Sequence, residues 1–153
     1  MSPDAGLEAA LDQRRRKLDL ERQVLAEREI AVQQQAAVLA AAGSRVRMVL
    51  SQIEFAQQPA PGIALPVALL GELEQLLRWC EAQVVAQRAH LEALRSEADE
   101  ARGAVANAHQ GVRALELVLE ARAAERAEKQ RRIEIREADE TAARVHAQKV
   151  GTR

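Results

Sequence analysis

Three histidines and one cysteine are the side chains of this sequence best suited to metal binding or nucleophilic chemistry. His90, His109 and His146 are widely dispersed and form no HExxH motif, and Cys80 has no second cysteine for a CxxC pair or a disulfide. A metal site needs several ligands that the fold brings together, and the spacing of these residues matches no known set of metal ligands. We therefore expect no metal and no cofactor, with His90 and His109 beside a helix seam and Cys80 packed as a small buried thiol.

Residues for covalent catalysis or phosphate chemistry are also missing. The four serines, at positions 2, 44, 51 and 96, have no plausible His/Asp partners, and there is no glycine-rich phosphate loop. The sequence therefore predicts a protein that is not an enzyme, with no catalytic residue.

The composition indicates long helices. Alanine occurs 32 times, whereas there is one Trp, one Phe and no Tyr in 153 residues. Alanine favours helix but contributes little burial, and strands lack their usual β-branched and aromatic residues. We expect an all-α fold.

Charge and hydropathy limit the possible partners and the location. The net charge is −1, and the basic run at 14–17 is flanked by Asp12, Asp19 and Glu21, so a solvated helix surface is favoured over a nucleic-acid site. No segment resembles a signal peptide or a membrane span. We expect a cytoplasmic protein that binds no nucleic acid and does not insert into the membrane.

One break divides the chain. Residues 57–66 hold three of the four prolines and Gly62. We expect a single domain, 1–153, with a first helix over about 5–57, a turn over about 58–66 and a second helix over about 67–149.

Heptad spacing on both sides of the break predicts a coiled coil. The apolar residues that recur every seven positions, and that we expect to form its core, are Leu11, Leu18, Leu25, Val32, Leu39, Val46 and Ile53 in the first helix and Leu70, Leu77, Val84, Leu91, Ala98, Val105 and Val112 in the second. A second seam of the second helix runs through Leu73, Cys80, Leu94, Ala101, Ala108 and Leu115, with Gln87 as its polar member.

The two sets of residues predict one antiparallel register. Facing residues of an antiparallel hairpin have position numbers with a constant sum. The seven pairs of core residues, of which Ile53 with Leu70 is the first and Leu11 with Val112 the last, all sum to 123, and half of that value falls in the proline-rich turn. The expected fold is an antiparallel coiled-coil hairpin. Its second helix is longer and projects at its C-terminal end by roughly 45 Å, because the first helix has no residues left to pair with it.

Two aromatic residues lie near the expected turn and off the main seam. Phe55 and Trp79 either pack against the turn or form an exposed anchor for a partner, since Trp is enriched at binding hot spots.

The segment 112–142 carries a recognisable order of residues. A leucine pair, Leu115 and Leu119, precedes Arg122 and Arg126. Alternating acidic and basic residues follow, and the pattern ends with the Asp-Glu pair at 139–140. This order resembles the C-terminal part of FliJ, the flagellar export stalk family, as do the chain length and the two-helix layout. The first helix lacks the aromatic residue with which that family usually opens, so flagellar and virulence-type export both stay open.

The resemblance implies a non-enzymatic central stalk of a type III export ATPase. The paired helix ends would enter a hexameric ATPase ring, and the hairpin tip would face an export-gate membrane protein at the inner membrane, with export chaperones as further partners. It implies a monomer in the complex. Residues expected to contact the ring are Arg122, Arg126, Arg132, Arg136, Asp139 and Glu140, and those expected at the gate-facing tip are Phe55 and Trp79.

Two other functions fit the same sequence. One is a structural coiled coil whose seams drive self-association into a four-helix bundle. The other is a helical chaperone or adaptor that binds client peptides along its alanine-rich groove.

Overall fold

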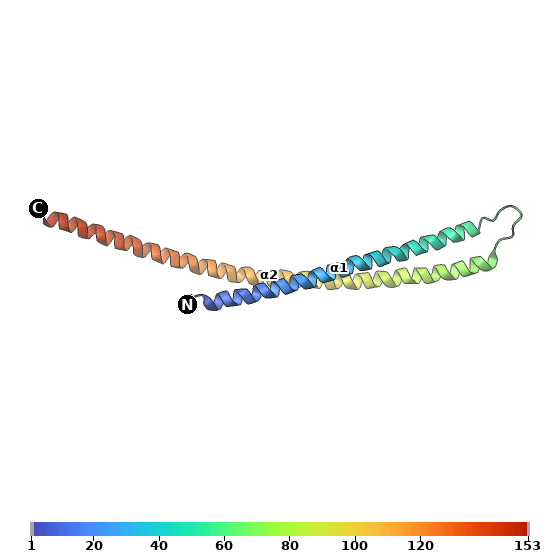
Figure 1. Ribbon diagram of the computed structural model, residues 1–153, viewed down its shortest axis with the longest axis horizontal. Coiled ribbons are helices and arrows are strands. Elements are labelled where there is room, and N and C mark those ends of the chain that lie inside the picture. Colours follow the sequence, from blue (N-terminus) through green and yellow to red (C-terminus); the bar gives the residue numbers. More distant parts are fainter. Residues whose placement is uncertain (1, 153) are drawn as a thin grey trace. The chain divides into compact units, whose positions relative to one another are not determined.

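The structure, a computed structural model, describes residues 2–152 and contains two long helices. Helix α1 spans Ala5–Ala56 and helix α2 spans Val67–Gly151, and residues 57–66 connect them (Figure 1). No strand occurs within the described residues. The predicted all-α class with a longer second helix is confirmed. Helix α1 ends one residue before the position expected from sequence, about 57. Helix α2 ends two residues after its expected position, about 149.

The connection between the helices follows from its prolines and its glycine. The N–H of Ile63 donates to the carbonyl of Ala60 at 3.0 Å, and Gly62 has φ of 85°. Proline at the second position and a positive φ at the third are typical of a type II turn. Pro66 immediately precedes α2, and its carbonyl accepts the N–H of Leu70 at 3.0 Å. It therefore caps α2 from outside, where its missing N–H costs no helical hydrogen bond.

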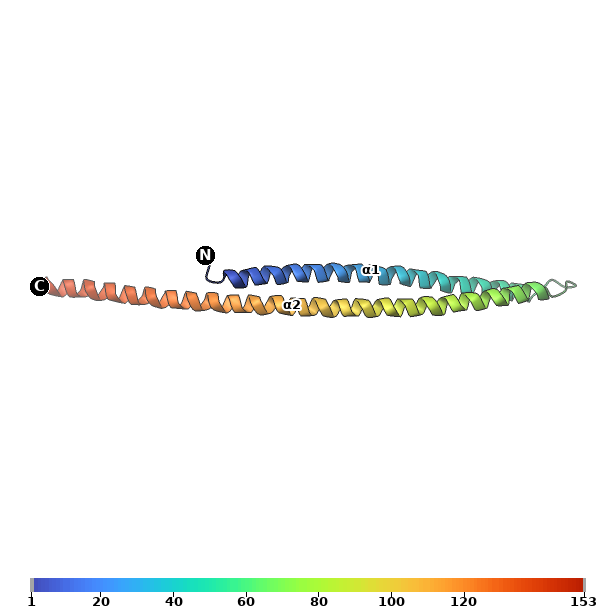
Figure 2. The same cartoon turned by 90° about the horizontal axis from the view of Figure 1, so that it is seen from below.

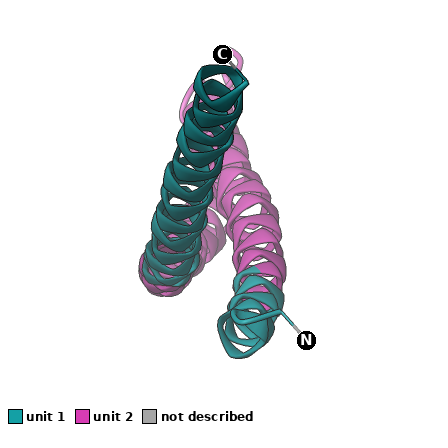
Figure 3. Cartoon of the chain, turned by 90° about the vertical axis from the view of Figure 1, so that its left-hand side faces the viewer, with its two compact units in different colours: residues 1–18, 107–153 teal, residues 19–106 magenta. Residues whose placement is uncertain are grey.

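The chain divides into two compact units (Figure 3). Unit 1 contains residues 1–18 and 107–153, and unit 2 contains residues 19–106. Each unit contains a stretch of α1 packed on a stretch of α2.

Unit 2 is a helical hairpin. Around the turn, the second half of α1 and the first part of α2 run side by side in opposite directions (Figures 1 and 2). Arg28 pairs with Glu97 at 2.9 Å, and Gln35 donates to Gln87 Oε1 at 2.6 Å and to the Gln87 carbonyl at 3.1 Å. The numbers of these partners add to values one or two away from the predicted sum of 123.

Other pairs of long charged side chains join residues whose position numbers add to values further from 123. Arg102 pairs with Glu29 at 3.6 Å in unit 2, and Arg15 pairs with Glu116 at 3.2 Å in unit 1. Side chains slant toward the N-terminus of their own helix, so in antiparallel helices two long side chains meet even when their Cα atoms are offset. The stagger therefore follows from side-chain direction.

None of the fourteen residues expected in the core is exposed. Those that are buried are Leu11, Leu18, Leu91, Ala98 and Val112, and those that are half-buried are Leu25, Val32, Leu39, Val46, Ile53, Leu70, Leu77, Val84 and Val105. A further set of buried residues on α1, which the sequence analysis did not identify, consists of Gln35, Ala42 and Val49. These three residues form a second seam of α1, again at seven-residue spacing.

In unit 1 the first turns of α1 lie beside α2 in the opposite direction (Figure 2). Arg14 Nη1 donates to the carbonyl of Gly111 at 3.0 Å, and Asp4, just before α1, contacts Arg122 and Arg126. Beyond Arg126, α2 continues to Gly151 without forming a hydrogen bond or ion pair to α1 among the described residues.

Neither helix, within residues 2–152, has a stretch that is long and apolar enough to span a lipid bilayer.

The Gln35–Gln87 contact yields a stability prediction. A polar layer in a coiled-coil seam fixes the register but stabilises less than an apolar layer. Replacing both residues, Gln35→Leu with Gln87→Leu, should raise the free energy of unfolding by about 1–3 kcal/mol, because two apolar side chains then fill the layer. Chemical denaturation followed by circular dichroism measures it. A double variant less stable than the native chain would show that the amide pair is needed for stability rather than for register.

Candidate functional site

The side chains best suited to metal binding or nucleophilic chemistry lie apart from one another. His90, His109 and His146 are exposed, and Cys80 is a free, buried cysteine. Within residues 2–152, no group of three or more His, Cys, Asp or Glu side chains is arranged to hold a metal ion. The remaining candidates for a functional surface are the polar contacts of unit 1 and the apolar residues beside the turn of unit 2.

The N-terminus of α1 is fastened to α2 by one carboxylate. Asp4 Oδ1 accepts from Arg122 at 3.1 Å, and Asp4 Oδ2 accepts from Arg126 at 2.6 Å. Asp4 is only 3% exposed, whereas the two arginine side chains are about half exposed. The three residues, which we call the Asp4 clamp, hold the start of α1 at this level of α2.

The clamp changes the titration of its carboxyl group. The hydrogen bond from Arg126 lowers the pKa of Asp4 below its usual 3.8, burial acts in the opposite direction, and the hydrogen bond from Arg122 lowers it again. The net result is a lowered pKa, so Asp4 is ionised at neutral pH. The negative charge also lies next to the N-terminus of α1, where the helix dipole favours an anion.

A second charged cluster contacts α1 at Arg15, about three turns after Asp4. Glu116 accepts from Arg15 at 3.2 Å and from Arg113 at 3.3 Å, and Arg113 also reaches Glu120 at 3.2 Å. The hydrogen bonds from Arg15 and Arg113 lower the pKa of Glu116. Only the Arg15–Glu116 pair joins the two helices, since Arg113, Glu116 and Glu120 all lie on α2. These pairs are partly exposed, and such pairs contribute little stability individually.

Past the clamp, α2 is a single charged helix. Every residue from 127 to 151 is exposed except Glu128, which is half-buried between its own helical neighbours. Glu128 pairs with Arg131 at 2.9 Å and with Arg132 at 3.1 Å. Pairs three and four residues apart stabilise a helix without any tertiary contact.

The six residues expected to contact a partner fall into two groups. Arg122 and Arg126 belong to the Asp4 clamp, and Arg132 pairs with Glu128. Arg136, Asp139 and Glu140 form no ion pair with other residues in the described part of the chain. The structure thus brings Arg122 and Arg126 together on Asp4 and leaves the other four on the exposed part of α2.

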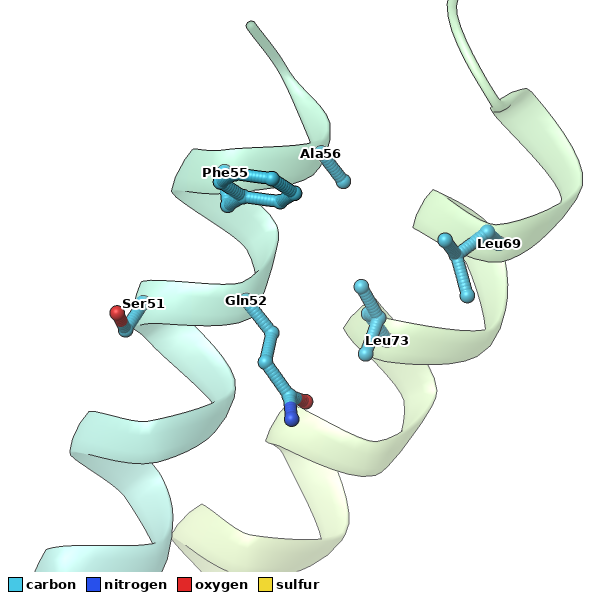
Figure 4. A pocket seen from close by; sticks show the side chains of 6 residues that line it. All are labelled: Ser51, Gln52, Phe55, Ala56, Leu69 and Leu73. Atoms are coloured by element: carbon cyan, nitrogen blue, oxygen red, sulfur yellow. The ribbon is translucent and has the colours of Figure 1, made fainter. Parts of the chain in front are cut away.

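Unit 2 carries an apolar groove beside the turn. Its lining residues are Ser51, Gln52, Phe55 and Ala56 from α1 and Leu69 and Leu73 from α2 (Figure 4). Phe55 is 84% exposed and Trp79, on α2 but outside this groove, is 55% exposed. Both aromatic side chains are therefore exposed, and their role as anchors for a partner stays a prediction.

Sequence reasoning missed Asp4 and the groove. A signal for Asp4 was present, since it lies seven residues before Leu11 and thus continues the seam as an acidic residue. The α2 half of the groove had a weaker signal, because Leu69 and Leu73 follow the turn directly. Their contribution depends on how the last turn of α1 meets the first turn of α2.

The Asp4 clamp predicts a pH-dependent local stability. Because the folded pKa of Asp4 is lowered, the clamp stabilises the start of α1 fully above the usual pKa of 3.8, and this stabilisation is lost as the pH falls through the lowered value. Asp4→Asn should speed amide exchange in the first turns of α1 at pH 7, and the difference from the native chain should shrink as the pH falls through the lowered pKa of Asp4 and its carboxyl group is protonated. A difference that stays the same throughout such a titration would show that the charge of Asp4 is not what fastens the helix.

Comparison with known proteins identifies the family of the chain. The family model described as flagellar FliJ protein matches residues 4–151, which is nearly the whole chain. No characterised protein and no solved structure matches the chain. The matched segment includes the Asp4 clamp, the groove and the exposed part of α2, and the chain belongs to the flagellar FliJ protein family.

Proposed function

We propose that this chain is the central stalk of a flagellar export ATPase. Its family is a structural component of the flagellar export apparatus, so the partners of the chain are expected within that apparatus. In the proposed role, the paired helix ends of unit 1 enter a hexameric ATPase ring. The tip of unit 2 faces an export-gate membrane protein, and export chaperones bind the same molecule.

One observation supports the ring contact above all others. Residues 127–151 of α2 are helical although they have no packing partner among the described residues. A lone helix of this length is marginal in water even with intrahelical ion pairs, and most helices in proteins depend on tertiary packing. A ring that receives this segment would supply the missing packing.

The charges of the segment suit a polar ring lining. Arg132, Arg136, Asp139 and Glu140 are exposed and lie on the part of α2 that α1 does not cover. Arg122 and Arg126 are half exposed beyond their contacts with Asp4. Arginine donates hydrogen bonds in a planar fork, so the four arginines of the two groups can bind carboxylates or carbonyls of ring loops.

At the other end, an uncharged surface suits the gate contact. Residues 55–71 contain no charged side chain, and Phe55 and Trp79 are exposed. Exposed aromatic side chains beside an apolar groove are typical of protein-binding surfaces. We therefore assign the tip to the export gate, and place the protein in the cytoplasm at the inner membrane, as a monomer within the complex.

The test separates the two ends of the molecule. Arg132→Ala with Arg136→Ala should require about tenfold more protein for half-maximal stimulation of the ATPase, because two charged hydrogen-bond donors are lost. Phe55→Ala should leave this stimulation unchanged and weaken binding to the cytoplasmic part of the gate protein. Both substitutions are at exposed positions, so circular dichroism should show unchanged helix content.

Arg122→Ala with Arg126→Ala is less direct, since it also opens the Asp4 clamp. Asp4→Asn is the matched control, because it opens the clamp and keeps both arginines. If the Arg132/Arg136 variant and the Arg122/Arg126 variant each stimulated the ATPase as fully as the native chain, the proposed ring contact would be ruled out.

A further inference from the structure

The exposed part of unit 1 carries an ordered row of residues along α2. Members of this row recur at alternating spacings of four and three residues, as in a coiled-coil seam. We call it the outer stripe, and it consists of Leu117, Ala121, Ala124, Glu128, Arg131, Ile135, Ala138, Ala142 and Val145.

The outer stripe lies on the side of α2 that faces away from α1. The side toward α1 is marked by Val112, which is buried, and by Leu115 and Leu119, which are half-buried. Leu117 lies two residues from both leucines, about 200° around the helix from each, and it is 50% exposed. α1 therefore leaves the whole stripe open to a partner.

Two shallow, open hollows occur on this stripe. Ala121 and Ala124 line the first, with Glu125, Lys129 and Arg132 beside them. Ala138, Ala142 and Val145 line the second, next to His146 and Lys149. Hollows between small residues on a helix receive the larger side chains of a facing helix.

The stripe also supplies the side chains that fit such hollows. Leu117 and Ile135 are its two bulkiest residues, and Ile135 is 53% exposed. They are 18 residues apart, and Ala124 and Ala142 are separated by the same 18 residues. A second copy in antiparallel orientation therefore places its Leu117 at Ala142 and its Ile135 at Ala124 at the same time.

Charges select the same alignment. In it, Glu128 of one copy faces Arg131 of the other, and the twofold symmetry repeats the pair. Each copy already pairs Glu128 with Arg131 at 2.9 Å, so the four side chains form an alternating cluster. A parallel alignment would place Glu128 on Glu128 and leucine on leucine, leaving the alanine hollows unfilled.

We propose that two copies of this chain associate through their outer stripes, antiparallel, over residues 117–145. The contact is isologous, so it closes at a dimer. It uses a different face from the α1–α2 seams. If the proposed ring contact holds, dimerisation and ring entry compete, because both use the same stretch of α2.

The test is a charge swap read by sedimentation equilibrium from about 1 to 100 µM. The native chain should shift from monomer to dimer with rising concentration. Glu128→Arg and Arg131→Glu should each remain monomeric, because like charges then face each other. A mixture of the two variants should form dimers, since both facing pairs attract.

Matched controls use the other side of the helix. Glu137→Arg and Arg136→Glu make the same charge changes away from the outer stripe, and each should dimerise like the native chain. A native chain that stays monomeric across the range would overturn the proposal. So would a Glu128→Arg and Arg131→Glu mixture that associates no more than either variant alone. Neither result would bear on the ATPase stimulation by which the proposed function is judged.

Discussion

The seam between α1 and α2 is the contact on which the other features depend. It is a narrow strip, in which Leu11, Leu18, Leu91 and Val112 are among the few large side chains that are buried. With alanine at many of the remaining positions, burial per residue is small, and stability is built up over many heptads. A helix that stabilises itself in this way needs a partner along its length, so the end of α1 determines where α2 becomes exposed.

Unit 1 combines apolar and charged contacts between the two helices. Beside the buried Leu11, Leu18 and Val112, Asp4 pairs with Arg122 and Arg126, and Arg15 pairs with Glu116. Both arginine side chains of the clamp are about half exposed, so they can fasten α1 in the free chain and still offer N–H groups to a further acceptor. The two ends of the molecule differ accordingly, with an uncharged groove near the turn and mixed charge at the far end of α2.

Much of the fold was predictable because its period is regular. Seven-residue spacing, the prolines of the turn and the constant sum of paired numbers specify two antiparallel helices without any tertiary information. The second seam of α1 escaped detection because Gln35 and Ala42 are not large apolar residues. The Asp4 clamp escaped because pairing between an acid and bases more than a hundred residues away depends on side-chain direction as well as spacing. The arginines were named as partner contacts from the family resemblance, and Phe55 and Trp79 from their residue type and position. Only the structure shows that Arg122 and Arg126 pair with Asp4.

Amide hydrogen exchange along α2, at submicromolar concentration with and without the export ATPase ring, tests the central claim most directly. In the free chain, residues 127–148 should exchange about a hundredfold or more faster than residues 85–105, because they have no packing partner. Adding the ring should slow exchange in 127–148 and leave 85–105 unchanged. Equal protection of both segments in the free chain, or no change in 127–148 on adding the ring, would contradict the account.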